Sequence, residues 1–217
     1  CDNVDLSLGF ARKEKENYLR FPLWITNFSP ESSYDDIKKQ IDRINARQTN
    51  VERTGTALIA SHDQFGTRSN IYDKLKDVIN VQCAGKWNNN TDDLRIKYNN
   101  NKFMYLQKMR FNICPENVDA SGYVTEKLFD ALGSGVIPIY QGAGGSPELD
   151  IVNQDAIIFW QFDSDNKDTI ELIMELNSND DLFEEFVMKP VFSKDAPEII
   201  WSYFNSLQCR LKAWGYQ

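Results

Sequence analysis

Short apolar runs alternate with segments of helical spacing from Thr56 to Trp160, and this alternation constrains the fold more than any other feature of the chain. The runs are apolar at successive positions rather than at every second one, which is the pattern of strands buried on both faces. Such strands form parallel sheets with helices packed on either side. We therefore expect an α/β fold whose strands are Thr56–Ser61, Ile79–Gly85, Arg110–Asn117, Val136–Tyr140 and Ala156–Trp160.

Helical spacing occurs between and after these runs. The expected helices are Ser32–Gln48, Thr67–Ile79 with Thr67 as N-cap, Thr125–Gly135, Lys167–Leu176, Asp180–Met188 and roughly Ala196–Trp214. An additional short strand is expected at Val4–Phe10, and the Asn-rich stretch Trp87–Lys102 is predicted to be a loop or a loop with a weak helix. Everything before about Asn50 reads as a connector or the end of another domain.

Charge and cysteine content exclude several classes of function. The net charge of −8 argues against broad binding to nucleic acid or to an anionic membrane surface, although it leaves a local phosphate pocket open. No run of 18 apolar residues is present. The four cysteines are far apart and form no C-x-x-C pair, so we expect reduced thiols rather than a zinc site or a disulfide framework.

Ligands of parallel α/β sheets bind beyond the carboxyl ends of the strands, at helix N-termini. One such terminus has an unusual first turn, in which Thr125 is the expected N-cap and Lys127 lies where the helix dipole disfavours a cation. Glu126 and Asp130 are like charges one turn apart. In one interpretation Lys127 folds over the terminus near Gly122 to bind a phosphate and Glu126 accepts from a ribose diol. In the other, Lys127 pairs with Asp130 on an exposed turn.

Arg68 is a parallel case, because it falls in the first turn of the helix that follows the strand Thr56–Ser61. It is either an ordinary surface arginine or a bidentate phosphate ligand. Together Arg68 and Lys127 suggest a pyrophosphate cradle, although the chain has no P-loop and no G-x-G-x-x-G motif.

Other polar features near this edge stay open. His62, the single histidine, is either a site residue or a plain loop residue. Asp163 and Asp165 superficially match a metal-binding D-x-D pattern, but capping of the following helix is the better interpretation. The glycines after Tyr140 form either a loop that admits a ligand or an ordinary flexible loop; these are Gly142, Gly144 and Gly145.

The segment Phe111–Gly142 carries the elements F-x-x-C-x-E-N, G-Y-V-T-E-K and I-P-I-Y-x-G. In this combination and order it resembles the signature block of the α-1,3/4-fucosyltransferases, glycosyltransferase family ten. The upstream segments "YLRFPLWI", "INARQ" and "ALIASHDQFGTRSNIYDKL" are similar to the segments that precede this block in the family. The resemblance is much weaker after Gly142.

The resemblance implies the donor-binding half of a GT-B enzyme, a Rossmann-like parallel sheet with flanking helices. Such an enzyme transfers L-fucose from GDP-fucose to an N-acetylglucosamine or glucose hydroxyl, with inversion and without a metal or other cofactor. By motif position, Arg68 and Lys127 would hold the diphosphate and contribute to catalysis. Glu126 would bind the ribose, and the donor pocket would also include Asn117, Tyr123, Gly122 and Thr125.

The resemblance also implies what lies elsewhere. The family's base and most acceptor contacts belong to an amino-terminal domain, so residues 1–50 would be a connector and remnant of it. Residues 51–195 would be the GDP-fucose domain and residues 196–217 a helix returning across the cleft. Expected partners are therefore GDP-fucose, a glycan acceptor and that amino-terminal domain, with no nucleic acid and at most peripheral membrane contact.

Several alternatives remain. The chain could bind a GDP-sugar without catalysis, or use another GDP-sugar. This second possibility arises because the loop "GAGGSPELD" departs from the family near the donor sugar, as Pro115 departs within C-x-E-N. Composition favours the bacterial cytoplasm or the cytoplasmic face of the inner membrane, and the alternative is the Golgi lumen of a eukaryote.

Overall fold

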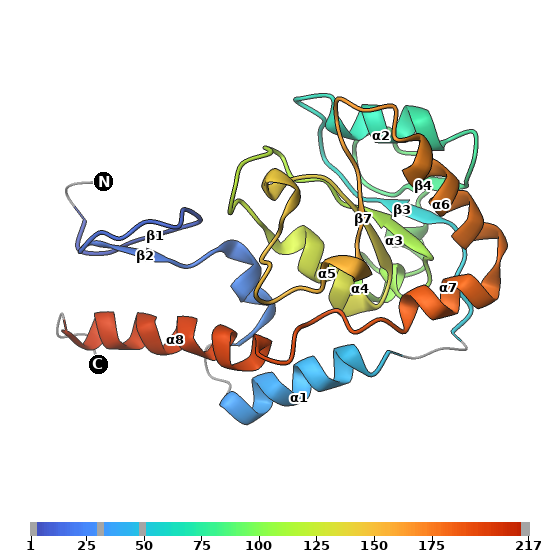
Figure 1. Cartoon of the computed structure of the whole chain (residues 1–217). Helices are drawn as coiled ribbons and strands as arrows, with labels where there is room; N and C mark the ends of the chain where they lie inside the picture. Colours follow the sequence, from blue (N-terminus) through green and yellow to red (C-terminus); the bar gives the residue numbers. More distant parts are fainter. Residues whose placement is uncertain (1–3, 30–32, 48–50, 214–217) are drawn as a thin grey trace.

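A five-stranded sheet forms the centre of the computed structural model, which describes residues 4–29, 33–47 and 51–213 (Figure 1). The strand order is β4-β3-β5-β6-β7, and every neighbouring pair is parallel. The strands are β3 (Thr56–Leu58), β4 (Val81–Cys83), β5 (Phe111–Ile113), β6 (Ile137–Tyr140) and β7 (Ile158–Phe159). Each lies inside a run predicted as a strand, so the α/β parallel-sheet prediction is confirmed.

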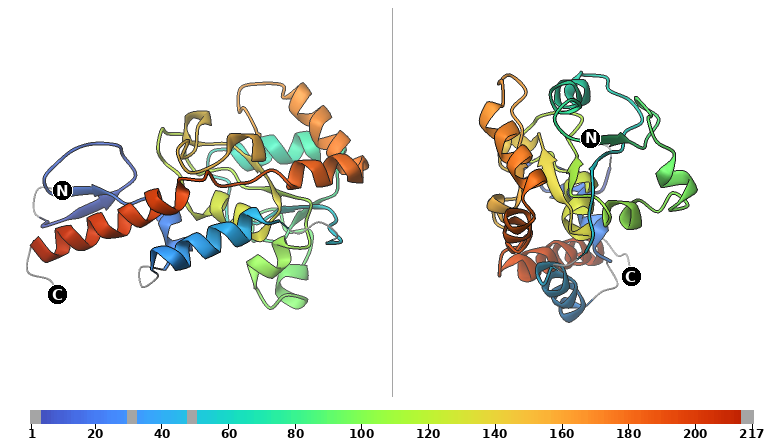
Figure 2. Two further views of the ribbon diagram at one scale, coloured as in Figure 1. Left: turned by 60° about the horizontal axis from the view of Figure 1, so that its bottom comes forward. Right: turned by 90° about the vertical axis from the view of Figure 1, so that its right-hand side faces the viewer.

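Helices cover both faces of the sheet because neighbouring residues of a strand point to opposite sides (Figure 2). Leu58, Phe111 and Ile113 join one core with α2 (Thr67–Leu75), α6 (Lys167–Ser178) and α7 (Asp180–Val187). Ala57, Cys114 and Tyr140 join the other core. That second core includes α1 (Tyr34–Asn45), α4 (Lys102–Leu106), α5 (Glu126–Ser134), the 3₁₀ helix η1 (Leu23–Asn27) and the start of α8 (Ala196–Ala213).

The start of α2 and the Asn-rich stretch that follows β4 differ from the prediction. The N-cap of α2 is Gly66, in the left-handed region at φ 73°, and Thr67 is already helical. The stretch predicted as loop or weak helix contains α3 (Asp93–Ile96), and α4 follows it as a helix that the spacing did not predict. The short 3₁₀ helices η2 (Ala143–Gly145) and η3 (Gln154–Ala156) complete the segment between β6 and β7.

The winding of the sheet reverses between β3 and β5. From β3 the chain moves outward to β4, then returns to the other side of β3 and continues through β5, β6 and β7. The connections therefore leave β3 and β5 in opposite directions, which opens a crevice beyond their carboxyl ends. This switch point determines where the candidate site lies.

The two ends of the chain pack together beside the sheet. Strand β1 (Ser7–Gly9) pairs in parallel with β2 (Tyr18–Arg20), and α8 packs against α1 and β2 (Figures 1 and 2). The Trp24 ring of η1 stacks on Phe129 of α5 at 4.5 Å between ring centroids, so the amino-terminal segment also shares the core of the sheet domain. The division at residues 50 and 195 stays a prediction.

A buried carboxylate joins this end of the molecule to the loop after β6. Glu148 is 3% exposed, accepts a hydrogen bond from Trp24 Nε1 at 2.9 Å and forms an ion pair with Arg20. Arg20 also contacts Tyr203 of α8. Three distant parts of the chain therefore meet at one anion.

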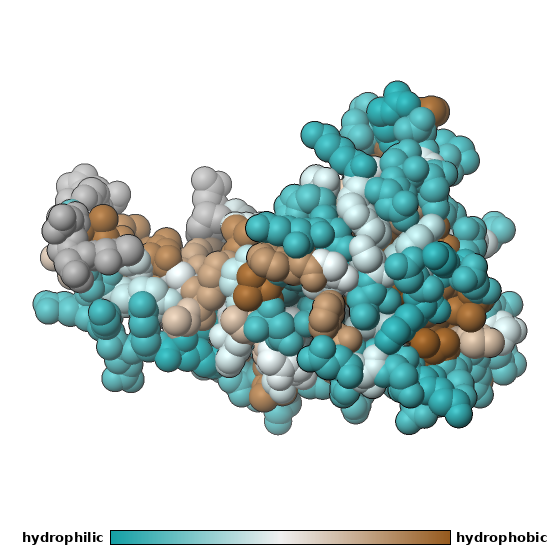
Figure 3. Space-filling view, turned by 90° about the horizontal axis from the view of Figure 1, so that it is seen from above, coloured by the Kyte–Doolittle hydropathy of each residue, from teal (hydrophilic) through white to brown (hydrophobic). Residues whose placement is uncertain are grey.

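Figure 3 shows the face of the molecule that lies at the top of Figure 1, and this face is largely hydrophilic. Hydrophobic residues reach it in small groups, one of them on the side on which β1 and β2 lie. Within the described ranges, no helix is both long enough and apolar enough to cross a membrane. The described cysteines, Cys83, Cys114 and Cys209, are free thiols, as predicted, and Cys1 lies outside the described residues.

Candidate nucleotide-binding site

A cavity of about 570 Å³ lies at the switch point of the sheet. Its walls come from the segments that follow β3, β4 and β5, together with the first turn of α5; they include Ser61, His62, Arg68, Asn117 and Lys127. This volume is within the ordinary range for a small-molecule site. Three of the predicted site residues, Arg68, Asn117 and Lys127, are brought together here although they are far apart in sequence.

Arg68 is held rigidly at the start of α2. Its side chain is 9% exposed, and its Nη2 donates to Asn117 Oδ1 at 2.7 Å. Asp63 accepts from the backbone N–H of Arg68 at 3.0 Å and from the N–H and hydroxyl of Ser69 at 2.8 and 2.5 Å. It thereby supplies the cap that Gly66 cannot provide. The interpretation of Arg68 as an ordinary surface arginine is therefore wrong.

The charge on Asp63 is favoured by these donors. Burial by itself would raise the pKa of its carboxyl, but the hydrogen bonds from Ser69 and Arg68 and the charge of Arg68 outweigh it and lower the pKa. The carboxylate is therefore ionised throughout the neutral range and holds the first turn of α2 in position.

Lys127 points back over the N-terminus of α5 rather than along the helix. Its Nζ lies 2.8 Å from Thr125 Oγ1, 3.3 Å from Glu116 Oε2 and 3.6 Å from Glu126 Oε1. Asp130 instead binds Lys102 at 2.8 Å. The alternative in which Lys127 pairs with Asp130 is therefore wrong.

Glu116 is the organising residue that the sequence analysis did not single out. It is 1% exposed and accepts from the Thr125 N–H at 2.8 Å and the Thr125 hydroxyl at 2.7 Å. Its carboxylate lies at the N-terminus of α5, where the helix dipole stabilises a negative charge. The Tyr140 hydroxyl donates to it at 3.4 Å, and burial together with the charge of Glu116 raises the pKa of Tyr140.

The role of Thr125 differs accordingly from the predicted one. Thr125 occupies the N-cap position, but its hydroxyl makes no cap hydrogen bond and is directed to Glu116 and Lys127. A signal for Glu116 was present in the sequence, because it is the single acidic residue of the apolar run Arg110–Asn117. A buried acid of this kind needs a partner.

The glycines after β6 serve packing and backbone contacts. A Cβ on Gly142 would lie 2.7 Å from Cγ of Glu116, and its φ of 143° is one that other residues rarely adopt. The N–H of Gly144 donates to Asp119 Oδ1 at 2.6 Å. Gly142 is thus required for the buried position of Glu116, and Gly144 is tied to the loop after β5.

Other predicted site residues lie outside the lining of the cavity. The Tyr123 ring packs on Phe10 with centroids 4.7 Å apart, and the Glu126 side chain is 38% exposed beside Lys127. Gly122 takes φ 76° in the turn before α5, and Thr125 is buried. His62, in contrast to these four residues, lines the cavity.

The D-x-D pattern belongs to a helix end. Asp165 Oδ1 accepts from the N–H of Lys167, the first residue of α6, at 3.1 Å, which agrees with capping. In the ranges that the structure describes, no group of three or more His, Cys, Asp or Glu side chains is arranged to hold a metal ion.

The arrangement is suited to binding a diphosphate. Arg68 and Lys127 approach one cavity from two helix N-termini, and Lys102 joins them around a small adjoining hollow of about 20 Å³. Fixed cations stabilise phosphate charge without reorganisation. The carboxylate of Glu116 compensates the charge of Lys127.

Comparison with known proteins identifies a family whose model matches most of the chain. Residues 50–189 match the family described as glycosyltransferase family 10 (fucosyltransferase), C-terminal part. An α-(1,3)-fucosyltransferase of Helicobacter pylori is 35% identical over 101 residues, which cover 46% of this chain and 20% of that protein. A GDP-fucose protein O-fucosyltransferase 3 of Xenopus laevis is 32% identical over 132 residues, or 58% of this chain and 28% of that protein.

Solved structures show the same fold. A crystal structure of an α1,3-fucosyltransferase superposes with a TM-score of 0.65 at 23% identity, covering 94% of this chain and 67% of that one. A crystal structure of an α1,3-fucosyltransferase with GDP-fucose also gives a TM-score of 0.65 and covers 94% and 69%. The matched segments span between a fifth and three tenths of the curated relatives' own lengths.

Proposed function

The chain belongs to glycosyltransferase family 10, the fucosyltransferases, and from that premise we propose that it supplies the site for GDP-fucose in an inverting transfer of L-fucose. The observation that carries the proposal is the convergence of Arg68 and Lys127 on one cavity at the switch point of the sheet. The solved relative that contains GDP-fucose supports the choice of donor.

In this proposal Arg68 and Lys127 act on the leaving group. Breaking the bond between fucose and the β-phosphate places a further negative charge on the departing GDP. The Arg68 guanidinium is held at 2.7 Å from Asn117, and the Lys127 ammonium at 2.8 Å from Thr125. Because both cations are already in position, they stabilise that charge without having to move. Lys127 can exchange its contact with Glu116 for one with phosphate, because its side chain is partly exposed.

The other donor contacts follow from the neighbours of this pair. Glu126 adjoins Lys127 and is exposed enough to accept from a ribose diol. Asn117 reaches the cavity and, through Arg68, connects the two halves of the site. Gly122, Tyr123 and Thr125 would act by shaping the turn before α5 rather than by lining the cavity.

The acceptor and the base that deprotonates it belong, in this proposal, to a further part of the protein. A base must lie within hydrogen-bond reach of the acceptor hydroxyl, on the face of fucose opposite GDP. The partial coverage of the relatives supports a second domain. The proposed acceptor is an N-acetylglucosamine or glucose hydroxyl in α-1,3/4 linkage, and the name of the Helicobacter pylori relative, an α-(1,3)-fucosyltransferase, supports the 1,3 linkage.

A second candidate acceptor is a hydroxyl side chain of a protein. It is favoured by the Xenopus laevis relative, a GDP-fucose protein O-fucosyltransferase that matches over a longer segment than the Helicobacter pylori protein. Transfer assays with labelled GDP-fucose, offering N-acetyllactosamine and an unfolded or folded polypeptide as acceptors, would separate the two.

The donor is tested by calorimetry with GDP, GDP-fucose, GDP-mannose and UDP. We expect GDP and GDP-fucose to bind and to raise the melting temperature, and UDP to do so much less. Equal binding of GDP-mannose would favour a transferase with another GDP-sugar. Binding of GDP-fucose without transfer by the full protein would favour a module without catalysis, and no binding of GDP would refute the proposal.

A further inference from the structure

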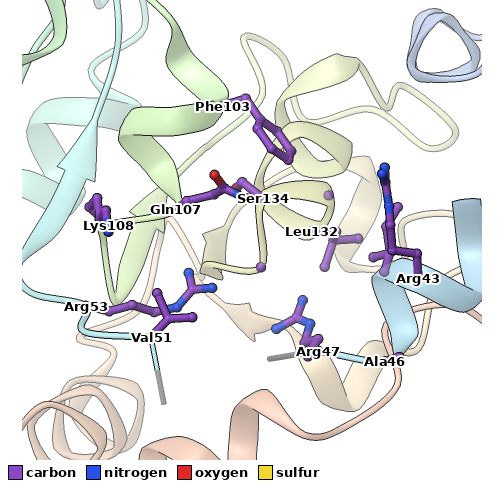
Figure 4. Close-up of a pocket in the computed structure, with 13 residues that line it drawn as sticks. Arg43, Ala46, Arg47, Val51, Arg53, Phe103, Gln107, Lys108, Leu132 and Ser134 are labelled. Carbon is purple, nitrogen blue, oxygen red and sulfur yellow. The ribbon is translucent and has the colours of Figure 1, made fainter. Parts of the chain in front are cut away.

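A second cavity, of about 460 Å³, lies at the opposite end of the sheet from the nucleotide site (Figure 4). Its walls come from segments that precede strands: Arg53 before β3, Lys108 before β5 and Gly135 before β6. The end of α1 contributes Arg43, and Arg47 follows it. We call this the cationic cavity and define it by Arg43, Arg47, Arg53 and Lys108.

The charged side chains that line the cationic cavity are all basic, and the other lining residues are apolar or neutral. Among the described residues, the lining contains these three arginines and the lysine but no aspartate or glutamate. Within the ranges that the structure describes, none of the four cations lies within ion-pair distance of a carboxylate. Because acidic residues outnumber basic ones in this chain of net charge −8, a cavity whose charged residues are all basic differs from the chain's average composition.

Arg47 is the residue that most clearly lacks a partner. Its Nε and Nη2 are shielded from solvent and make no hydrogen bond in the described part of the chain. Figure 4 shows the guanidinium groups of Arg47 and Arg53 directed into the same space. Burial and the nearby charge of Arg53 lower the pKa of Arg47 to about 10, so the group is still charged at neutral pH.

Both arginines lie at the carboxyl end of a helix, Arg53 beside α5 and Arg47 just after α1, where a cation is favourable, but only Arg53 also finds an acceptor among the described residues. Arg53 lies against Gly135, where its Nη2 would be 2.8 Å from an added Cβ, and a cation is favourable at this carboxyl end of α5. Its Nη1 also donates to the Met109 carbonyl at 3.5 Å. Among the described residues Nε and Nη2 of Arg47 have no such acceptor, and leaving shielded donors of a charged group unpaired is costly.

We propose that the cationic cavity binds a small molecule carrying one or more phosphate groups, at a site separate from the nucleotide site. Two guanidinium groups and further cations match a multiply charged oxyanion, because each guanidinium donates in a planar fork to two oxygens. The cavity is also larger than a single phosphate ion requires. The ligand would supply the acceptors that Nε and Nη2 of Arg47 lack.

The test is calorimetry with inorganic pyrophosphate as the probe. Binding of pyrophosphate at the nucleotide site is first suppressed by saturating GDP or, independently of whether GDP binds, weakened by Arg68→Ala. We expect pyrophosphate to bind the remaining site, tighter than succinate. Arg47→Gln should weaken this binding at least tenfold and Arg47→Lys, which keeps the charge but loses the fork, by less. Lys39→Gln, which removes an exposed lysine of α1 outside the cavity, should leave it unchanged.

Thermal unfolding separates a ligand-binding arginine from a structural one. Without added anion, Arg47→Gln should melt at the same temperature as the parent protein or higher, because it removes an unpaired charge. Pyrophosphate should raise the melting temperature of the parent and of Lys39→Gln but not of Arg47→Gln. The proposal is overturned if the blocked protein does not bind pyrophosphate, if succinate binds as tightly, if Arg47→Gln binds as the parent does, or if Arg47→Gln melts lower without anion.

Discussion

The guanidinium of Arg68 donates from Nη2 to Oδ1 of Asn117 at 2.7 Å, and this bond crosses the switch point of the sheet. One partner stands in the first turn of α2, and the other in the loop that follows β5. The site cation contributed by one half of the winding is therefore oriented by the other half.

Replacement of Arg68 tests this cation directly. We expect Arg68→Ala to weaken GDP binding by about 1.5–3 kcal/mol, the range for a charge-assisted hydrogen bond. Arg68→Lys should recover only part of the loss, because lysine keeps the charge but lacks the fork that Asn117 orients. Calorimetry measures both, with Lys76→Ala, an exposed lysine just beyond the same helix, as the control. Unchanged affinity in Arg68→Ala would remove Arg68 from the site.

Lys127 provides the second cation, and its loss has a structural side effect. Lys127→Ala should weaken GDP by about 1.5–3 kcal/mol and also lower stability, because Glu116 then keeps its Thr125 donors but not the ammonium. The control is Lys97→Ala, which removes an exposed i,i+4 partner of Asp93. Calorimetry and urea unfolding on the same samples report the two effects. A variant that loses stability but binds GDP normally would assign Lys127 to the fold alone.

Neutralising Glu116 should damage the fold more than neutralising Glu126. Glu116→Gln places an amide nitrogen among groups that donate, so we expect a loss of about 1–3 kcal/mol of unfolding free energy. Glu126→Gln alters an exposed side chain and should change stability by less than about 0.5 kcal/mol. Urea unfolding compares them. Equal effects of the two substitutions would show that Glu116 does not organise the turn.

Gly142→Ala probes the packing around Glu116, and Gly133→Ala, with the opposite expected sign, serves as its comparison. Gly142→Ala should destabilise by about 1–3 kcal/mol, since the added Cβ meets Glu116 and the backbone lies at φ 143°. Gly133→Ala, inside α5 with no atom within 4 Å of the added carbon, should stabilise by about 0.5–1 kcal/mol. Thermal unfolding decides both. Tolerance of Gly142→Ala would mean that the loop after β6 yields easily.

The carboxylate of Asp63 predicts a pH dependence of stability. Its pKa in the folded protein lies below the ordinary value of 3.8, so its stabilising contribution is complete above that value. The contribution is lost as the pH falls through the folded pKa. Asp63→Asn should cost about 0.5–2 kcal/mol at pH 7, the value of a helix cap, and progressively less below pH ~4. Unfolding of both proteins from pH 2 to 7 checks this; a difference independent of pH would contradict it.

Much of the fold could be read from the sequence because local pattern and tertiary environment agree. The apolar runs around Leu58, Phe111 and Ile139 are buried on both faces, and the helix before Gly135 ends at that glycine in the left-handed conformation. By contrast, α4 was missed, because its five residues are too few to show a period and its surroundings are rich in Asn.

The site was predictable only in part. Arg68 and Lys127 stood out because each opens a helix where a cation is locally unfavourable. Glu116 did not, since its partners Thr125 and Lys127 are contributed by tertiary contact across the turn. The cationic cavity was equally invisible, because Arg47 and Arg53 read as ordinary charged residues until the chain folds.

The reversal of the sheet has a consequence for folding as well as for binding. Arg68 and Asn117 approach each other only once β3 and β5 have paired, and that pairing joins segments distant in sequence. Such contacts form late and at a high cost in loop entropy. GDP binding should therefore depend on complete folding of the sheet. A partly folded chain, or a truncated piece that contains only β3 or only β5, should not bind GDP. Two complementary pieces that associate should regain GDP binding.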